Sequence, residues 1–228
     1  MITVILPTYN EAENIENVVK NIRKTGAEVN ILIIDDNSPD GTGKLADIIS
    51  KKYKSVSVVH RKNKAGLGSA IKNGFEACSG IVGVMDADMS HDPSIIPDII
   101  KEFGGGADFV IGSRYAKTGG IERWPFYRKL ASRVATAIAK PLTPVKDPVS
   151  GYFFIKKSVI NGMKINPESC KICLDILVRG GYKNVVEVPY TFRNRPAGKT
   201  KILNVKEVLK YIKYVSYLYK YRIARCFR

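Results

Sequence analysis

The chain has 228 residues, of which 45% are hydrophobic, and a formal net charge of +16. A chain of this length forms one sizeable domain, and none of its apolar runs reaches the ~18–20 residues that a membrane-spanning helix needs. The charge predicts polyanionic ligands, namely nucleic acid, an anionic lipid surface or phosphorylated substrates. Half of this net charge lies in the C-terminal segment, because residues 199–228 hold nine Lys or Arg and one acid.

The N-terminus and the cysteines indicate a reduced, cytosolic protein. Met1 leads straight into the first predicted strand, so no signal peptide is expected. The four cysteines do not form a disulfide framework in a chain this long, and Cys170 and Cys173 lack the second pair that a zinc site requires. We therefore expect free thiols.

Short apolar runs alternate with amphipathic segments through the first 111 residues. Asn10 is expected to cap the first helix, with Glu13 three residues later. The predicted strands are 2–6, 30–34, 55–59, 81–85 and 109–111, and the later predicted helices are 42–53, 69–77 and 93–103. This alternation predicts an α/β fold with a mostly parallel, doubly wound sheet.

Polar side chains follow four of these strands. They occupy Pro7–Glu11, Asp35–Asp40, Asp86–Asp88 and Arg114. Ligands of such sheets bind beyond the carboxyl ends of the strands. The convergence therefore predicts a nucleotide-type ligand that lies across several strand ends.

Asp86 and Asp88 end the central apolar run. Alternation along an extended chain places both carboxylates on one side and Ala87 on the other. Two adjacent carboxylates repel each other unless a cation neutralises them, and Mg²⁺ or Mn²⁺ with a bound diphosphate suits such oxygen ligands. The alternative is a solvated acidic turn, because an Asp-x-Asp sequence alone is common.

Two other nucleotide-binding classes do not fit the sequence. A dinucleotide-binding turn requires Gly-x-Gly-x-x-Gly after the first strand, where this chain has Pro7–Glu11 without glycine. Gly66 and Gly68 lie in a different turn without the third glycine, and the sequence has no Walker lysine loop. These observations exclude the dehydrogenase and P-loop classes.

Six motifs occur in order along the chain: LPTYNEAENI (6–15), IIDDNSPDGTG (33–43), NKAGLGSAIKNGF (63–75), MDADMSHDP (85–93), IGSRY (111–115) and VPYTFRNRPAGKTK (188–201). Together they resemble the inverting glycosyltransferases of the GT-A fold, and within them the dolichyl-phosphate mannose synthases. The resemblance covers residues 2–203. It implies a GT-A catalytic domain over 1–203, and the helical spacing of the remaining residues predicts a basic amphipathic helix over 204–228.

The resemblance implies a donor site and a metal site at the strand ends. Pro7, Tyr9 and Glu11 match contacts to the base and ribose. Asp36 matches the carboxylate that reads the base, with Ile34 beside it, and a carboxylate can accept from the donors of guanine. The implied donor-binding residues are Pro7, Tyr9, Glu11, Ile34, Asp36, Asp86, Ala87, Asp88, Arg114, Ile172, Arg195 and Lys201. The implied ligands of Mg²⁺ or Mn²⁺ are Asp86, Asp88 and Ser90.

The same resemblance implies inverting transfer of mannose from GDP-mannose to dolichyl or polyprenyl phosphate, giving a β-linked polyprenyl phosphate mannose and GDP. The acceptor phosphate is already an anionic nucleophile, so no general base is required. The implied catalytic residues are Asp88, Arg114, Arg195 and Lys201, and the implied acceptor-phosphate contacts are Arg114, Arg128 and Arg133. Asp147 and Asp175 match acidic positions with structural or orienting roles. UDP-glucose or another sugar nucleotide is the alternative donor.

The C-terminal segment predicts an interfacial helix. Its apolar stripe is Val205, Val208, Leu209, Ile212, Val215 and Tyr219, and its basic row is Lys206, Lys210, Lys213 and Lys220. With a lipid acceptor, this pattern favours a peripheral protein at the cytosolic face of a membrane and leaves a small membrane partner subunit open. The alternative is a helix docked on the core with a solvated lysine face.

A basic nucleic-acid-binding protein is the alternative from another functional class. The sequence contains no recognised nucleic-acid-binding module. Its acids lie at the strand ends, where they would repel a polyanion. We therefore expect no nucleic acid partner.

Overall fold

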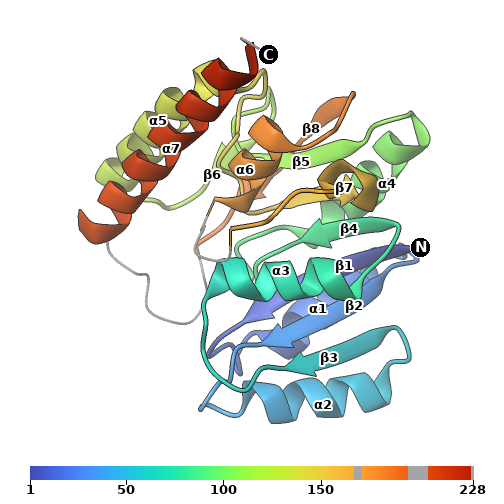
Figure 1. The fold of residues 1–228 in the computed structure, drawn as a ribbon. Helices are drawn as coiled ribbons and strands as arrows, with labels where there is room; N and C mark the ends of the chain where they lie inside the picture. The colour runs from blue at the N-terminus through green and yellow to red at the C-terminus, as the bar shows by residue number, and fades with distance from the viewer. Residues whose placement is uncertain (167–170, 195–204, 227–228) are drawn as a thin grey trace.

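The computed structural model describes residues 1–166, 171–194 and 205–226, and its centre is a mostly parallel sheet (Figure 1). The seven-stranded sheet has the order β3-β2-β1-β4-β7-β5-β8. Its strands are β1 (Ile2–Thr8), β2 (Asn30–Asp35), β3 (Val56–His60), β4 (Ile81–Val84), β5 (Phe109–Ser113), β7 (Phe153–Lys156) and β8 (Val185–Pro189). A two-stranded sheet pairs β6 (Gly120–Ile121) with β9 (Thr191–Phe192). The predicted fold class is confirmed.

Strand β7 is the exception in the large sheet, because it runs antiparallel between β4 and β5. The pairings of β1 with β2 and β4, of β2 with β3, and of β5 with β8 are parallel. The carboxyl ends of β1, β2, β4 and β5 therefore lie along one edge of the sheet. The four polar clusters of the sequence all lie at this edge.

Helices cover both faces of the sheet. They are α1 (Ile15–Lys24), α2 (Thr42–Lys52), α3 (Leu67–Ala77), α4 (Ile96–Gly104), α5 (Phe126–Ala139), α6 (Ile172–Arg179) and α7 (Val205–Cys226). Strand residues alternate between the faces, so Val4 and Leu6 pack with α1, α2 and α4, while Ile5 packs with α3 and α6. Two buried cores therefore hold the strands from opposite sides.

A third cluster joins α5, α6 and α7 at one flank, where α5 and α7 lie side by side (Figure 1). Tyr211 Oη donates to the Ala135 carbonyl (2.6 Å), and Val215 and Leu218 of α7 are buried. This face of α7 docks on the core, as in the alternative considered for the helix. Three residues of the predicted apolar stripe nevertheless stay exposed: Val208, Leu209 and Ile212. None of the described helices is long and apolar enough to cross a membrane.

The prediction that Asn10 caps the first helix is wrong. Helix α1 begins at Ile15, after a turn in which the N–H groups of Asn14 and Ile15 donate to the Glu11 carbonyl (3.0 and 2.9 Å). Asn10 adopts φ 60°, and its N–H donates to Ser38 Oγ (3.1 Å). A contact to the neighbouring turn therefore replaces the expected cap. The other predicted elements begin and end within two residues of the observed ones, if the 3₁₀ turn η1 (Pro93–Ile95) is counted with α4.

Candidate active site

The turns after β1 and β2 form one unit. Glu11 N–H donates to Thr42 Oγ1 (2.9 Å), and Ala12 N–H donates to Asp40 Oδ2 (3.1 Å). Thr42 donates to Asp40 Oδ1 through its N–H (3.0 Å) and its hydroxyl (2.6 Å). Burial raises the pKa of the Asp40 carboxyl, but these hydrogen bonds outweigh burial and lower it below its ordinary value. The backbone that carries Pro7, Tyr9 and Glu11 is thereby fixed.

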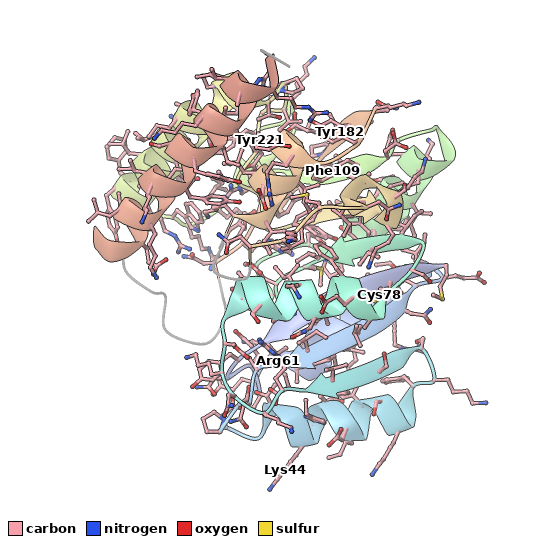
Figure 2. All side chains as sticks on the ribbon, viewed as in Figure 1. Lys44, Arg61, Cys78, Phe109, Tyr182 and Tyr221 are labelled. Atoms are coloured by element: carbon pink, nitrogen blue, oxygen red, sulfur yellow. The ribbon has the colours of Figure 1, made fainter. Side chains whose placement is uncertain are left out.

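Asp36 is buried and bound by the loop that leads into α3. Its carboxylate accepts from Arg61 Nη1 (2.7 Å) and from the N–H groups of Ala65 (3.0 Å) and Gly66 (2.8 Å). Arg61 also donates to Ser69 Oγ (2.6 Å) and lies beside the carboxyl ends of β2 and β3 (Figure 2). The predicted base-reading carboxylate is therefore held by a cation and two backbone donors.

The same loop reaches the other predicted base contacts. Lys64 Nζ lies 3.5 Å from the centroid of the Tyr9 ring, a cation–π contact. Ile34 is fully buried in the core on the α3 side. The structure thus brings Tyr9, Asp36 and the residues 61–66 to one end of the sheet. The sequence gives no indication of the part that Arg61 plays.

Asp86 and Asp88 follow β4, and their environments differ. The Asp86 side chain is 37% exposed, whereas Asp88 and Ala87 are buried. Ser90 donates to Asp88 Oδ1 through its N–H (3.0 Å) and its hydroxyl (2.5 Å). One carboxylate is therefore accessible and the other is fixed in direction by Ser90.

His91 is a site residue that sequence reasoning missed. It is buried, its Nδ1 accepts from the Asp86 N–H (3.0 Å), and its ring stacks on Tyr152 at 5.0 Å between centroids. Tyr190 and Phe192 pack edge-on at 5.7 Å. Burial lowers the pKa of His91. A neutral ring therefore carries its proton on Nε2 and positions the Asp86 backbone.

Arg114 is nearly buried and paired with Asp147. Asp147 accepts from the Arg114 backbone N–H (3.0 Å), from Nε (2.8 Å) and from Nη2 (2.7 Å). Burial disfavours the charged guanidinium, but Asp147 outweighs burial and raises the pKa of Arg114. Glu187 in turn accepts from the N–H of Asp147 (3.0 Å). Asp147 thus orients Arg114, which agrees with its expected supporting role.

Aromatic rings connect Arg114 to α5 and to the segment that precedes it. Arg128 Cζ lies 4.0 Å from the Trp124 ring centroid, and Arg114 Cζ lies 6.0 Å from the same centroid. Tyr115 Oη donates to Ser132 Oγ (2.8 Å), which ties the end of β5 to α5. Two predicted phosphate contacts are therefore gathered around one indole.

The remaining predicted residues lie elsewhere. Arg133 is exposed on α5. Ile172 is buried in the core at the start of α6, and Asp175 is paired with Arg179 (2.6 Å). Arg195 and Lys201 lie outside the described residues.

Known proteins are similar to this chain in sequence and in fold. Residues 3–163 match the model of glycosyl transferase family 2. The dolichol-phosphate mannosyltransferase of Pyrococcus furiosus is 43% identical over 227 residues, which cover 96% of this chain but only 64% of that protein. The polyprenol monophosphomannose synthase of Mycolicibacterium smegmatis is 36% identical, over 90% of this chain and 83% of that protein.

A solved structure shows the same fold at lower identity. It is a mannosyltransferase from Pyrobaculum calidifontis in complex with GDP-Man and Mn²⁺. The TM-score is 0.63 at 19% identity, over 87% of this chain and 57% of that chain.

Proposed function

The chain belongs to glycosyl transferase family 2, and from this premise we propose that it transfers mannose from GDP-mannose to a polyprenyl phosphate such as dolichyl phosphate. The product is a β-linked polyprenyl phosphate mannose, and GDP leaves. The names of relatives that match 90% or more of the chain support the transfer of mannose and this acceptor.

One observation carries the proposal. The edge of the sheet combines a nucleotide end, formed by Tyr9 and Asp36, with the carboxylates Asp86 and Asp88 and with Arg114. Phe192 lies between the carboxylates and Arg114. Its ring centroid is 5.7 Å from that of His91, which binds the Asp86 backbone, and 6.0 Å from Arg114 Cζ. An anionic donor and an anionic acceptor can therefore meet between a carboxylate pair and a fixed cation.

The carboxylates fit a divalent cation of the Mg²⁺ or Mn²⁺ type. Asp86 and Asp88 would hold the ion together with donor phosphate oxygens, because carboxylate and phosphate oxygens are the ligands that such hard cations prefer. The described residues contain no cluster of three or more His, Cys, Asp or Glu that could hold a metal ion. When bound, the ion stabilises the charge that develops on the leaving nucleoside diphosphate. Ser90 donates to Asp88, and we propose that Ser90 orients the Asp88 carboxylate toward the ion.

The residues of the chain supply alignment and charge. The acceptor phosphate needs no base, so the protein must hold its oxygen in line with the anomeric carbon. Arg114, oriented by Asp147, and Arg128 on α5 are the described cations that would bind phosphate oxygens, with Arg133 nearby in sequence. We also assign the binding of phosphate oxygens to Arg195 and Lys201, on the resemblance alone.

A membrane surface is the proposed location of the acceptor. Helices α5 and α7 expose a set of large apolar side chains: Phe126, Tyr127, Leu130, Val134, Ile138, Val208, Leu209, Ile212 and Ile223. Phe126 is 80% exposed, and Arg128, Lys129 and Lys210 lie on the same two helices. Apolar side chains flanked by cations are typical of helices that bind anionic lipid surfaces.

Vesicle binding tests this surface. Phe126→Ser combined with Leu130→Ser should weaken binding to vesicles containing anionic lipid at least tenfold, because two large apolar groups no longer enter the lipid. Leu45→Ser combined with Ile48→Ser, on exposed positions of α2, is the matched control and should change binding little. Equal loss in both variants would argue against α5.

The reaction is tested by transfer of labelled mannose from GDP-mannose to a short polyprenyl phosphate, with Mn²⁺, with Mg²⁺ and with chelator. A metal-dependent, mild-acid-labile lipid product is expected, and Asp88→Ala should abolish it. Transfer from UDP-glucose but not from GDP-mannose would make UDP-glucose the donor in place of GDP-mannose. Tight nucleic acid binding that is unchanged in Asp88→Ala, without transfer, would favour the non-enzyme alternative.

A further inference from the structure

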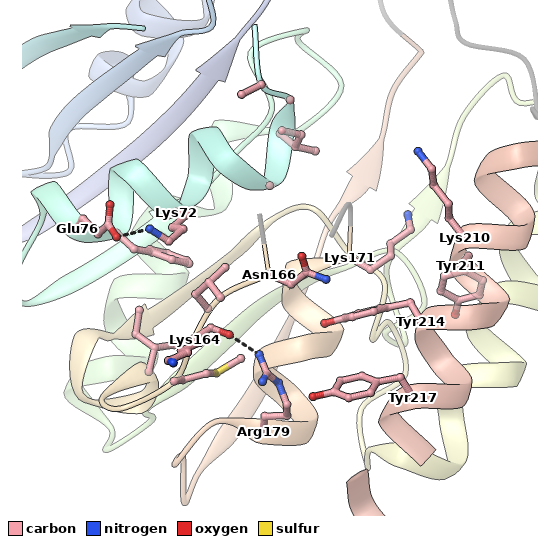
Figure 3. Close-up of a pocket in the computed structure, with 18 of the residues that line it drawn as sticks. Lys72, Glu76, Lys164, Asn166, Lys171, Arg179, Lys210, Tyr211, Tyr214 and Tyr217 are labelled. Atoms are coloured by element: carbon pink, nitrogen blue, oxygen red, sulfur yellow. Dashed lines mark hydrogen bonds and ion pairs between the residues drawn. The ribbon is translucent and has the colours of Figure 1, made fainter. Parts of the chain in front are cut away.

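A large cavity lies between α3 on one side and α6 and α7 on the other (Figure 3). Its volume is about 1510 Å³, whereas small-molecule pockets hold roughly 300–1,000 Å³. It begins at Ala65–Gly68, where the loop that binds Asp36 leads into α3, and extends along α3 to Glu76. Asp86, Asp88 and Arg114 are not among the described residues that line it, so it is separate from the carboxylate site.

The wall of this cavity is rich in cations beyond the average of the chain. Seven of the twenty described lining residues are Lys or Arg, compared with 37 of 228 in the whole sequence. The cations are Lys72, Lys157, Lys164, Lys171, Arg179, Lys210 and Lys213. Glu76 is the one acid among the described lining residues. The positive charge of the protein is therefore concentrated at this concave surface, where low-dielectric walls strengthen its field.

Some of these cations are neutralised and others are not. Lys72 pairs with Glu76 (2.5 Å), and Arg179 pairs with the buried Asp175, as Figure 3 shows in part. In the described parts of the chain, no carboxylate pairs with Lys157, Lys164 or Lys213. The last two are exposed. Lys157 Nζ donates to the Cys78 carbonyl (3.3 Å), so the exposed ammonium groups of Lys164 and Lys213 are the ones available to an anion from solution.

Fixed polar groups line the same wall. Arg179, the last residue of α6, is held by Asp175 and donates to the Lys164 carbonyl (2.7 Å). This bond ties the segment around Lys164 to the C-terminal end of α6. On α7, the rings of Tyr214 and Tyr217 stack at 6.1 Å. Lys171 and Lys210 extend in the same direction above them (Figure 3). Ammonium groups and hydroxyl donors on rigid elements are suited to phosphate oxygens.

We propose that this cavity is a second anion site that binds a phosphate-bearing ligand other than the sugar donor. The phosphate oxygens accept from Lys164 and Lys213, which both line the cavity, one in the segment between the 3₁₀ turn η3 (Lys157–Ile160) and α6 and the other on α7. The phosphate belongs either to the headgroup of an acidic phospholipid or to a free phosphorylated molecule.

Pyrophosphate is the probe for this site. Its binding to the full chain is measured by calorimetry in metal-free buffer with chelator. Lys164→Ala combined with Lys213→Ala should weaken the affinity at least tenfold, which corresponds to about 1.4 kcal/mol. Lys51→Ala combined with Lys54→Ala removes the same charge from the α2 end of the molecule, at exposed positions, and should change the affinity less than twofold. Equal weakening in both variants, or no saturable binding to the wild type, would overturn the proposal.

Vesicle flotation identifies the source of the phosphate. The vesicles contain phosphatidylcholine and phosphatidic acid. If pyrophosphate releases the wild-type protein from these vesicles but does not change the vesicle binding of the cavity variant, the ligand is a lipid headgroup. If both variants bind vesicles alike while their pyrophosphate affinities differ, the ligand is a free phosphorylated molecule. Mannosyl transfer by the cavity variant should persist, so the result is independent of the proposed reaction.

Discussion

Replacing Asp147 by Asn tests whether Arg114 depends on one buried carboxylate. The Asp147 side chain has no exposed surface, and the Arg114 side chain is 9% exposed. Asparagine keeps the shape, but it removes the charge and turns an amide N–H₂ toward the guanidinium donors. Breaking a buried ion pair costs about 3–5 kcal/mol, because the remaining charge stays buried without its partner. We expect the free energy of unfolding to fall by this amount.

Urea unfolding followed by circular dichroism measures the loss, and Asp108→Asn is the control. Asp108 pairs with Lys156 at 2.9 Å, but the two side chains are 23% and 38% exposed. The same substitution there should cost about 1 kcal/mol or less. Mannosyl transfer should also fall in D147N because Arg114 loses its orientation. Equal stability of the two variants would refute the reasoning.

Three further predictions concern the nucleotide end and the carboxylates. Arg61→Met leaves the buried Asp36 without its cation, and we expect a loss of about 3 kcal/mol in urea unfolding that Asp36→Asn in the same chain partly restores; a purely additive double variant would contradict the pairing. His91→Phe keeps the ring but leaves the Asp86 N–H without an acceptor, so transfer should fall and stability should drop by about 1–3 kcal/mol, whereas unchanged transfer would remove His91 from the site. Because the folded-state pKa of Asp40 is lowered, its contribution to stability is present above the ordinary carboxyl pKa and is lost as pH falls through the folded value. Unfolding measured from pH 6 downward should therefore show a weaker acid dependence in Asp40→Asn than in the wild type, and parallel curves would contradict this.

The sheet and its ligand edge follow from patterns within short segments. Apolar runs such as 30–34 and 81–85 have strand length and alternate with amphipathic helices, which is sufficient to predict a parallel sheet. The polar residues after these runs then share one edge by topology alone. The position of Asp36, Asp86 and Asp88 at this edge of the sheet was predictable for this reason.

The features that escaped prediction depend on contacts between distant segments. Asn10 has the residue type of a cap, but Ser38 binds its N–H and the helix starts five residues later. His91 is one residue of a polar turn, and its burial depends on Tyr152 and Tyr190, which lie more than sixty residues away. Helical spacing predicted α7 but not its docking face, because α5 and α6 select which side is buried.

The antiparallel strand β7 has a consequence for the order in which the protein is built during translation. Strand β4, which precedes Asp86, has β1 on one side and β7 on the other. β4 ends at Val84 and β7 begins at Phe153, so at roughly 5–20 residues per second the ribosome needs several seconds to supply the second neighbour. During that interval Val82 and Val84 form an open, apolar strand edge, which is a template for aggregation. A nascent or truncated chain that stops before residue 153 should need a chaperone to stay dispersed, and its carboxylate pair would be among the last parts of the molecule to become rigid.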